Sequence, residues 1–313
     1  LEVFRTGRGR GAVLCETDRG IKLLKECRMS EKRVALDAGC KEALREAGLR
    51  VDCYLKNKEG AYLSEDTEEG GTYTLRDWFD GRECSTRDER EMTAACELLA
   101  RFHRECRNLA FSEDERNELG KQQSLSKVIE KHNRELKRAR AYIRNTVQKG
   151  EFELGVIRSF APFYEQAVQA EVELKAVSKM PEIYLCHGDF TQHHVLMDGE
   201  GAALVEFSRM GMGVQVSDLY QYLRKMMEKN GWSIRLGERL LAAYEVVCPM
   251  TEEERHYLYV LFLYPEKYWK QINHYYNANK AWRPGRNTEK LTALEEQFEV
   301  RQIFLRWLKR RLS

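Results

Sequence analysis

The spacing of apolar residues along this 313-residue chain changes character near residue 80. Before that point it indicates short strands and one helix. Residues 12–16 and 21–25 form a predicted hairpin that turns at Asp18-Arg19-Gly20, and Ser30 is a typical N-cap for a helix that Gly48 ends. Further short strands are predicted at residues 51–55, 61–63 and 72–78. This part of the chain therefore predicts a small antiparallel sheet with one helix.

Long helical patterns dominate the rest of the chain. The predicted helices cover residues 88–107, 126–149, 155–177, 218–230, 236–247, 252–277 and 287–312. Three short strand candidates interrupt them, at residues 182–186, 195–197 and 203–207. The sequence thus predicts an α+β protein of two lobes, an N-terminal lobe over residues 1–79 and a larger, mostly helical C-terminal lobe over residues 80–313.

The overall composition excludes several classes of protein. With 52 Lys and Arg against 50 Asp and Glu, the net charge of +2 gives no global attraction to nucleic acid or to a membrane surface. No stretch approaches the roughly 18 apolar residues that a membrane-spanning helix needs. The nine cysteines form no CxxC pair, which favours reduced thiols over a disulfide framework or a zinc site. No charged and apolar leader precedes Leu1, and we expect the chain in the cytoplasm.

The stretch from Leu185 to Met197 carries the strongest sign of chemistry. Within it, His187-Gly188-Asp189 places an acid in a loop between two short predicted strands. A carboxylate in such a loop can accept the proton of an attacking hydroxyl, while a second polar residue a few positions on helps to hold a metal ion against phosphates. Glu206 closes the next predicted strand, and Asp218 opens a predicted helix after a Gly-rich turn.

These residues resemble the aminoglycoside phosphotransferase and choline kinase group of small-molecule kinases. The motif of that group is His-Gly-Asp, four residues, Asn, an Ile-Asp-Phe or Ile-Asp-Trp strand about a dozen positions on, and an Asp-Leu pair after a similar interval. Here positions 194, 206 and 218 follow one another at intervals of 12 residues. The resemblance implies a two-lobed protein-kinase-like fold, ATP or alternatively GTP with Mg²⁺ or Mn²⁺, and a small-molecule or protein acceptor with a hydroxyl or amine. It assigns catalytic positions to Asp189 and His187, metal-binding positions to Glu206 and His194, and a structural position to Asp218.

A closer resemblance is to the CotS-type spore coat proteins, and it covers nearly the whole chain. The segments that carry it are Arg8-Gly9-Arg10-Gly11, Asp77-Trp78-Phe79-Asp80-Gly81-Arg82-Glu83-Cys84, Asp218-Leu219-Tyr220, Tyr264-Pro265-Glu266-Lys267-Tyr268-Trp269-Lys270 and Asn273-His274-Tyr275-Tyr276-Asn277. The resemblance implies a kinase-like protein of sporulation, made in the mother cell of a spore-forming bacterium, with the spore coat as a destination and other coat proteins as partners.

Two positions depart from the kinase motif. His194 stands where the motif has its metal-binding Asn, and Glu206 stands where it has its metal-binding Asp. Imidazole is a poor ligand for Mg²⁺, which prefers oxygen donors, whereas the longer Glu can still reach a metal with altered geometry. Two hypotheses therefore stay open. One is a phosphotransferase with weakened or lost activity, and the other is a non-catalytic coat assembly protein, a pseudokinase that keeps the fold.

On the N-terminal side, the kinase-like fold would place a phosphate-contacting Lys on the predicted strand 21–25, paired with an acid on the following helix. Lys25 is the preferred residue and Lys22 the alternative. Their odd offset puts them on opposite faces of a strand, so only one of them can enter the cleft. The candidate partners on the helix are Glu31 and Glu42.

Two basic segments have more than one interpretation. The run Arg8-Gly9-Arg10-Gly11 suits a loop over phosphates, because backbone amides and Arg side chains can face anions. A solvated turn or an RNA-contacting tail fits the run as well, although the neutral charge balance argues against nucleic acid. Residues 127–144 contain seven Lys and Arg that could bind an acidic partner, but interleaved apolar residues favour an amphipathic surface helix.

Overall fold

The computed structural model describes residues 3–5, 12–66, 70–177, 179–277 and 284–313. The chain forms two compact units. The first comprises residues 1–121, 183–226 and 238–249, and the second comprises residues 122–182, 227–237 and 250–313. The boundary predicted between residues 79 and 80 falls inside the first unit, so the division into lobes at that point stays a prediction.

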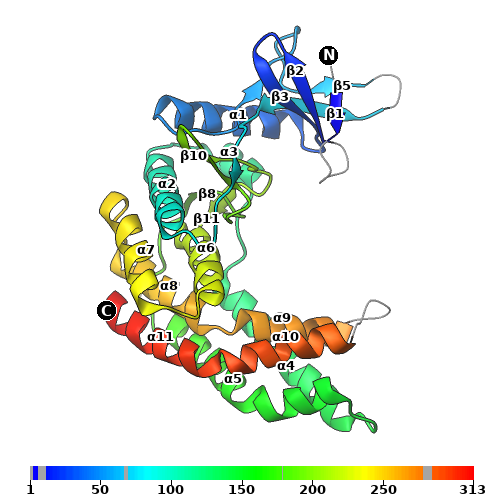
Figure 1. Cartoon of the computed structure of the whole chain (residues 1–313), viewed down its shortest axis with the longest axis vertical. Helices are drawn as coiled ribbons and strands as arrows, with labels where there is room; N and C mark the ends of the chain where they lie inside the picture. The colour runs from blue at the N-terminus through cyan, green and yellow to red at the C-terminus, as the bar shows by residue number, and fades with distance from the viewer. Residues whose placement is uncertain (1–2, 6–11, 67–69, 178, 278–283) are drawn as a thin grey trace. The chain divides into compact units, whose positions relative to one another are not determined.

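An antiparallel sheet forms the N-terminal part of the first unit (Figure 1). Its order is β1-β2-β3-β6-β4, and β5 also pairs with β6. The strands are β1 (Val3–Arg5), β2 (Ala12–Thr17), β3 (Gly20–Glu26), β4 (Tyr54–Leu55), β5 (Ser64–Glu65) and β6 (Thr72–Asp77). The predicted hairpin is confirmed as β2 and β3. Gly20 closes it with a φ of 82°, a conformation that glycine adopts without a steric penalty.

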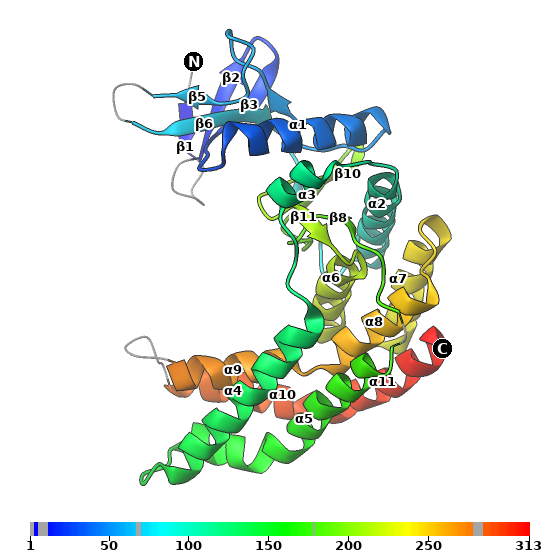
Figure 2. The same ribbon diagram turned by 180° about the vertical axis from the view of Figure 1, so that it is seen from behind.

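The predicted helix of this region is α1 (Glu31–Glu46). The Ser30 side chain accepts a hydrogen bond from the Arg33 amide and caps the helix, and Gly48 with a φ of 82° follows its end. Figure 2 shows α1 running along the sheet. Apolar side chains from both elements fill the space between them, among them Cys27, Val34, Ala38 and Tyr54.

Short strands and helices complete the first unit. One small sheet has the order β10-β9-β7 and a second pairs β11 with β8. These strands are β7 (Arg82–Glu83), β8 (Tyr184–Cys186), β9 (Val195–Asp198), β10 (Gly201–Leu204) and β11 (Gly211–Gly213). The helices are α2 (Glu89–Arg107), α3 (Glu113–Leu119) and most of α6 (Val216–Lys229) and α7 (Ile234–Val247). The third predicted strand ends at Leu204, so Glu206 lies in the turn after β10 and not on the strand.

The second unit is helical, with α4 (Leu125–Asn145), α5 (Glu151–Lys175), α8 (Glu252–Leu263), α9 (Glu266–Asn277), α10 (Pro284–Glu296) and α11 (Phe298–Leu312). Two helices predicted as continuous are each broken in two. The break between α8 and α9 lies at Tyr264, whose ψ of 126° is extended because the following Pro265 disfavours the helical conformation. Within the described ranges, no helix combines the length and the apolar character needed to cross a membrane.

A buried ion pair connects α1 to the rest of the first unit. The Lys41 ammonium donates to the Asp52 carboxylate at 2.8 Å and to its carbonyl at 2.9 Å, and both side chains are nearly inaccessible to solvent. Burial lowers the pKa of Lys41, although the charge of Asp52 opposes that shift. The second carboxylate oxygen of Asp52 accepts from the Glu206 amide at 3.3 Å and lies 3.7 Å from Arg76 Nη1. Asp52 therefore fixes α1, β6 and the turn after β10 relative to one another.

We expect Lys41→Met to lower the free energy of unfolding by about 3 kcal/mol, because it leaves the Asp52 carboxylate buried without its ammonium partner. Urea unfolding followed by circular dichroism measures the change. The control is Lys32→Met, an exposed position on the same helix, where a change within about 0.5 kcal/mol is expected. Equal effects of the two substitutions would show that the buried pair contributes nothing specific.

Candidate active site

Asp218 holds the loop that contains the His-Gly-Asp sequence. It lies buried in the first turn of α6, and its carboxylate accepts hydrogen bonds from the His187 amide at 2.7 Å and from the Gly188 amide at 3.0 Å. His103 Nε2 of α2 lies 3.3 Å from the same carboxylate. These contacts fix the backbone just before Asp189. Asp218 thus lies where a structural residue for this loop is expected.

Gly188 makes the turn possible. Its φ is 80°, and a Cβ at this position would lie 2.1 Å from the carbonyl oxygen of Arg209. No side chain fits in that space, because the two nearest atoms belong to the Arg209 backbone and cannot rotate away. The loop that contains His187-Gly188-Asp189 therefore requires glycine at this position to pack against the turn before β11.

Both ring nitrogens of His187, one of the two residues expected to be catalytic, contact main-chain groups. Its Nδ1 accepts from the Asp189 amide at 3.3 Å and its Nε2 donates to the Val205 carbonyl at 3.1 Å. The ring is completely buried, and burial lowers its pKa, which keeps the imidazole neutral. Both ring nitrogens are thus occupied by main-chain groups, so His187 joins the loop to the segment before Glu206 and has no nitrogen left for a substrate.

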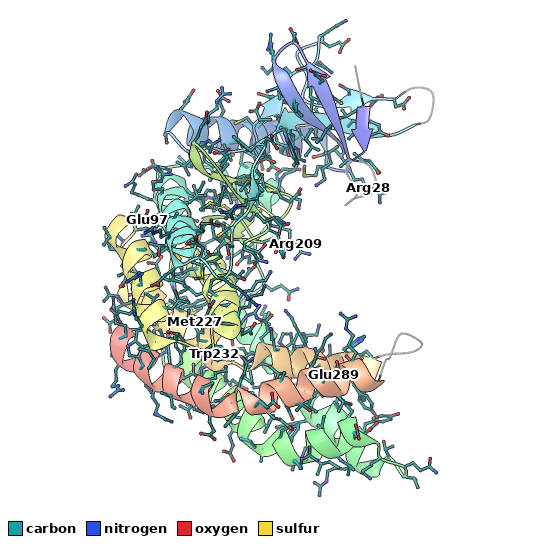
Figure 3. The ribbon with its side chains drawn as sticks, viewed as in Figure 1. Arg28, Glu97, Arg209, Met227, Trp232 and Glu289 are labelled. Carbon is teal, nitrogen blue, oxygen red and sulfur yellow. The ribbon has the colours of Figure 1, made fainter. Side chains whose placement is uncertain are left out.

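Asp189 offers an open carboxylate. Its side chain is 35% exposed, and its nearest charged neighbour is Arg209, whose Nε lies 3.9 Å away. Figure 3 labels Arg209, on the loop between β10 and β11. Among the described residues, none donates a hydrogen bond to this carboxylate. The backbone carbonyl of Asp189 does have a partner, because His194 Nδ1 donates to it at 2.7 Å. The loop is held from both sides while its acid remains available to a hydroxyl.

Lys25 and Glu206 form an ion pair, with 2.6 Å between Nζ and Oε2. Burial alone would raise the pKa of Glu206, but the hydrogen bond and charge of Lys25, the charge of Arg76 and a hydrogen bond from Ser208 outweigh it and lower that pKa to about 2. Glu206 also has a φ of 67°, a conformation that costs a residue with a Cβ about 1 kcal/mol. Lys25 thus lies against the carboxylate at the expected metal position.

The partner of Lys25 differs from the expected one. Glu31 is exposed at the start of α1 and Glu42 pairs with Arg45, so neither reaches Lys25. The physical reason is the orientation of α1, which turns Asp37 and Lys41 toward the core instead of the two glutamates. Lys22, the alternative, pairs with Asp77 at 2.9 Å on the other face of β3. The predicted loop Arg8-Gly9-Arg10-Gly11 lies outside the described residues.

The residues at the two metal positions fit a divalent cation only in part. In the described ranges, no three His, Cys, Asp or Glu side chains gather into a metal-binding group. Glu206 supplies a carboxylate, which suits Mg²⁺ or Mn²⁺, but Lys25 occupies it. Because His194 Nδ1 donates to a carbonyl, its lone pair is on Nε2, so this position offers nitrogen where Mg²⁺ prefers oxygen.

Sequence reasoning missed Asp52, in the segment before β4, and Arg76 of β6, which both support Glu206. The position of Lys41 in the sequence could have indicated Asp52. Lys41 lies on the same helix face as Val34 and Leu44, and a charged residue on an apolar face demands a buried partner. Arg76 occupies an inward position of β6 in the same way, with its guanidinium 4.7 Å from the centre of the Tyr54 ring.

Two solved structures with a similar fold are of proteins named as phosphotransferases. An aminoglycoside phosphotransferase from Alicyclobacillus acidocaldarius superposes with a TM-score of 0.87 over 100% of this chain and 92% of that one, at 15% sequence identity. A spectinomycin phosphotransferase, APH(9)-Ia, superposes with a TM-score of 0.60 over 96% of this chain and 93% of that one, at 10% identity. At these identities the likeness shows the fold, which is the two-lobed protein-kinase-like fold that the sequence motif implied.

The sequence places the chain more narrowly. Residues 16–308 match the family Spore_coat_YutH, described as "Spore coat putative kinase YutH". Spore coat protein S of Bacillus subtilis strain 168 is 26% identical over 285 residues, which cover 88% of this chain and 80% of that protein. The chain belongs to this spore coat family of kinase-like proteins, and the resemblance to the CotS type is confirmed.

We predict that Gly188→Ala destabilises the protein by about 3 kcal/mol or more, because the new Cβ overlaps a carbonyl oxygen and the residue must keep a left-handed φ. Thermal unfolding measures the loss. Gly199→Ala is the matched control, since a Cβ there has no atom within 4 Å, and it should leave the melting temperature almost unchanged. A Gly188→Ala protein as stable as the control would contradict the packing described for the loop.

A second prediction concerns acid stability. The folded-state pKa of Glu206, about 2, lies below its ordinary value of 4.5, so the ion pair contributes stability that is present above pH 4.5 and lost as the pH falls toward 2. Lys25→Met removes most of this contribution, and the urea midpoint of the variant should therefore fall less steeply with pH over that window. In a Glu206→Gln background, Lys25→Met should not alter the pH dependence. Parallel pH curves for the unaltered chain and Lys25→Met would refute the assignment.

Proposed function

We propose that this protein is a phosphotransferase that moves the γ-phosphoryl group of a nucleoside triphosphate, ATP or GTP, to a hydroxyl or amine acceptor. The observation that carries the proposal is the arrangement in the first unit. An open carboxylate, Asp189, lies on a loop anchored by Asp218, and His187 ties that loop to the segment that presents Glu206 to Lys25. Chance rarely brings an available acid and a lysine–carboxylate pair to adjoining segments of one rigid site.

In this proposal each side chain has one role. Lys25 binds phosphate oxygens, for which its ammonium leaves the Glu206 carboxylate. Asp189 accepts the proton of an acceptor hydroxyl while the acceptor oxygen bonds to the γ-phosphorus and the nucleoside diphosphate leaves with the electrons of the broken P–O bond. Glu206 would hold Mg²⁺ or Mn²⁺ through a carboxylate oxygen, and such an ion neutralises charge on the phosphates.

The Lys25–Glu206 pair couples the binding of nucleotide to the binding of a divalent cation. A phosphate that takes Lys25 without a cation leaves Glu206 charged and half-buried, and a cation that takes Glu206 leaves Lys25 without a counter-charge. Neither charge is left unpaired when a metal–nucleotide complex binds as one ligand. The proposed enzyme therefore binds nucleotide weakly unless a divalent cation accompanies it.

A second candidate is a non-catalytic assembly protein of the spore coat that retains the kinase-like fold. Two observations favour it. His194 presents a nitrogen where the motif has an oxygen ligand, and Lys25 already neutralises the Glu206 carboxylate. On either candidate we also propose synthesis in the mother cell and deposition in the coat, and the family match supports this part of the proposal.

Nucleotide binding is the first test of the phosphotransferase proposal. We expect ATP or GTP with Mg²⁺ or Mn²⁺ to raise the melting temperature of the purified chain, since a ligand that binds only the folded state stabilises it by mass action. Lys25→Met should abolish most of this shift. Lys22→Met is the matched control on the opposite face of β3 and should retain it. Each shift is taken relative to the same variant without ligand.

Turnover is measured separately as release of nucleoside diphosphate. Asp189→Asn should keep the metal-dependent melting shift and lower turnover by about a hundredfold or more. His194→Asn, which supplies an amide oxygen at the metal position, should enlarge the shift with Mg²⁺. No shift at millimolar nucleotide with either metal would overturn the phosphotransferase proposal, and so would equal turnover of Asp189→Asn and the unaltered chain.

A further inference from the structure

Helix α5 of the second unit is apolar on two opposite faces. One face is buried and includes Val156, Phe163 and Leu174. The opposite face carries a row of apolar side chains at spacings of three and four residues, and its clearest members are Leu154, Ile157, Val168 and Val172, between 39% and 55% exposed. Ala161 and Tyr164 fill the intervals of the same row. We call these six residues the outer stripe.

The outer stripe is narrow and regular. Positions separated by three and then four residues return to the same side of a helix, so the six side chains form a single line along α5. This is the pattern by which a second helix packs onto the first, with anchors at i, i+3 and i+7. An amphipathic surface helix needs only its buried face to pack, so the exposed members of the outer stripe are available to a partner.

A row of cations borders the stripe on one side. Helix α4 packs antiparallel to α5, and the two lie side by side in Figure 2. Lys137 Nζ lies 5.8 Å from the centre of the Tyr164 ring, and the Arg140 guanidinium carbon lies 4.6 Å from the centre of the Phe160 ring. Arg144 follows four residues after Arg140 on the same side of α4.

Among the described residues, these three cations have no direct ion-pair partner, although the charge of Lys137 reaches Glu171 of α5, whose pKa is lowered mainly by hydrogen bonds from Lys175 and Asn133. All three side chains are exposed, and within the described part of the chain none of Lys137, Arg140 and Arg144 forms an ion pair. The other border of the stripe is different, because Glu151 and Glu165 lie there with Arg158. The surface thus combines a line of apolar anchors with positive charge on its α4 side.

We propose that the outer stripe and the cations of α4 form a docking surface for an amphipathic helix of a partner protein, with acidic residues on the flank that faces α4. The apolar anchors of that helix pack along α5. Its acidic side chains meet Lys137, Arg140 and Arg144, and this charge complementarity sets the orientation of the partner. The surface lies in the second unit, so the inference is independent of the proposed phosphotransferase activity.

Two other occupants fit less well. A membrane surface favours a broad apolar face with exposed Trp or Phe and basic residues on both borders, whereas this stripe is one residue wide and Glu165 borders it. A second copy of the chain in an antiparallel two-fold arrangement would bring the two rows of α4 cations together, which is unfavourable. Both alternatives are outcomes of the test.

The probe is a fluorescent synthetic peptide with leucine at i, i+3 and i+7 and glutamate along one flank. Binding to the full chain is followed by fluorescence anisotropy without nucleotide. We expect this peptide to bind at least about tenfold more tightly than a scrambled peptide of the same composition or a version with lysine in place of glutamate. Added salt should weaken its binding.

Paired variants locate the binding surface. Two double variants should each bind the peptide with the glutamate flank about tenfold more weakly, or more weakly still. They are Ile157→Ser with Val168→Ser, and Lys137→Glu with Arg144→Glu. Two matched controls should bind as the unaltered chain does. They are Val246→Ser, an 84% exposed valine outside α5, and Arg138→Glu, a cation that points away from α5 on the same helix. Circular dichroism and thermal unfolding verify that every variant is folded.

Four results would overturn the inference. The first is equal affinity for the glutamate, lysine and scrambled peptides, and the second is undiminished binding to the stripe variant. The third is binding to vesicles rich in anionic lipid that the stripe variant loses, since it would identify a membrane as the occupant. The fourth is a dimer in light scattering that Ile157→Ser with Val168→Ser converts to a monomer, since it would identify a second copy.

Discussion

The first unit depends on one buried carboxylate, that of Asp52. It receives the Lys41 ammonium from α1 and the backbone amide of Glu206, and it lies beside Arg76 of β6. Charges removed from water in this way are worth little as net stability, but each partner becomes costly to remove or to misplace. The pair therefore acts mainly on geometry. It decides where the turn that carries Glu206 lies relative to the sheet that carries Lys25.

Because the turn is fixed, it matters that position 206 holds Glu where the kinase motif has Asp. Glu206 is held with a left-handed φ by its surroundings, and its side chain is one methylene longer than the aspartate of the motif. The extra length goes with a 2.6 Å contact to Lys25. The two groups that a metal–nucleotide complex would use thus neutralise each other, and the site remains electrostatically balanced without a ligand. A balanced site is stable at neutral pH but binds weakly, because a ligand must first replace an existing ion pair.

How much of this could be read from the sequence depends on the range of each interaction. Local signals predicted the hairpin with Gly20 and the helix capped by Ser30, because a turn or a cap is decided within a few residues. The offsets of the kinase motif predicted the fold. The partner of Lys25 could not be found this way, since Glu206 is 181 residues away and only the tertiary packing of the first unit brings the two together. Pro265 is a local signal for the helix break at Tyr264, but the helical periodicity continues across it and concealed the break.

The two proposed sites belong to separate units, so the two proposals do not depend on each other. Nothing in the outer stripe of α5 contributes to the position of Asp189, and no residue that supports Asp189 borders α4. A substitution at Glu206 or His194 therefore bears on the proposed phosphoryl transfer and leaves the proposed docking surface of α5 unchanged. Slow or absent phosphoryl transfer is thus compatible with a chain whose remaining surface still recognises a partner by apolar anchors and charge.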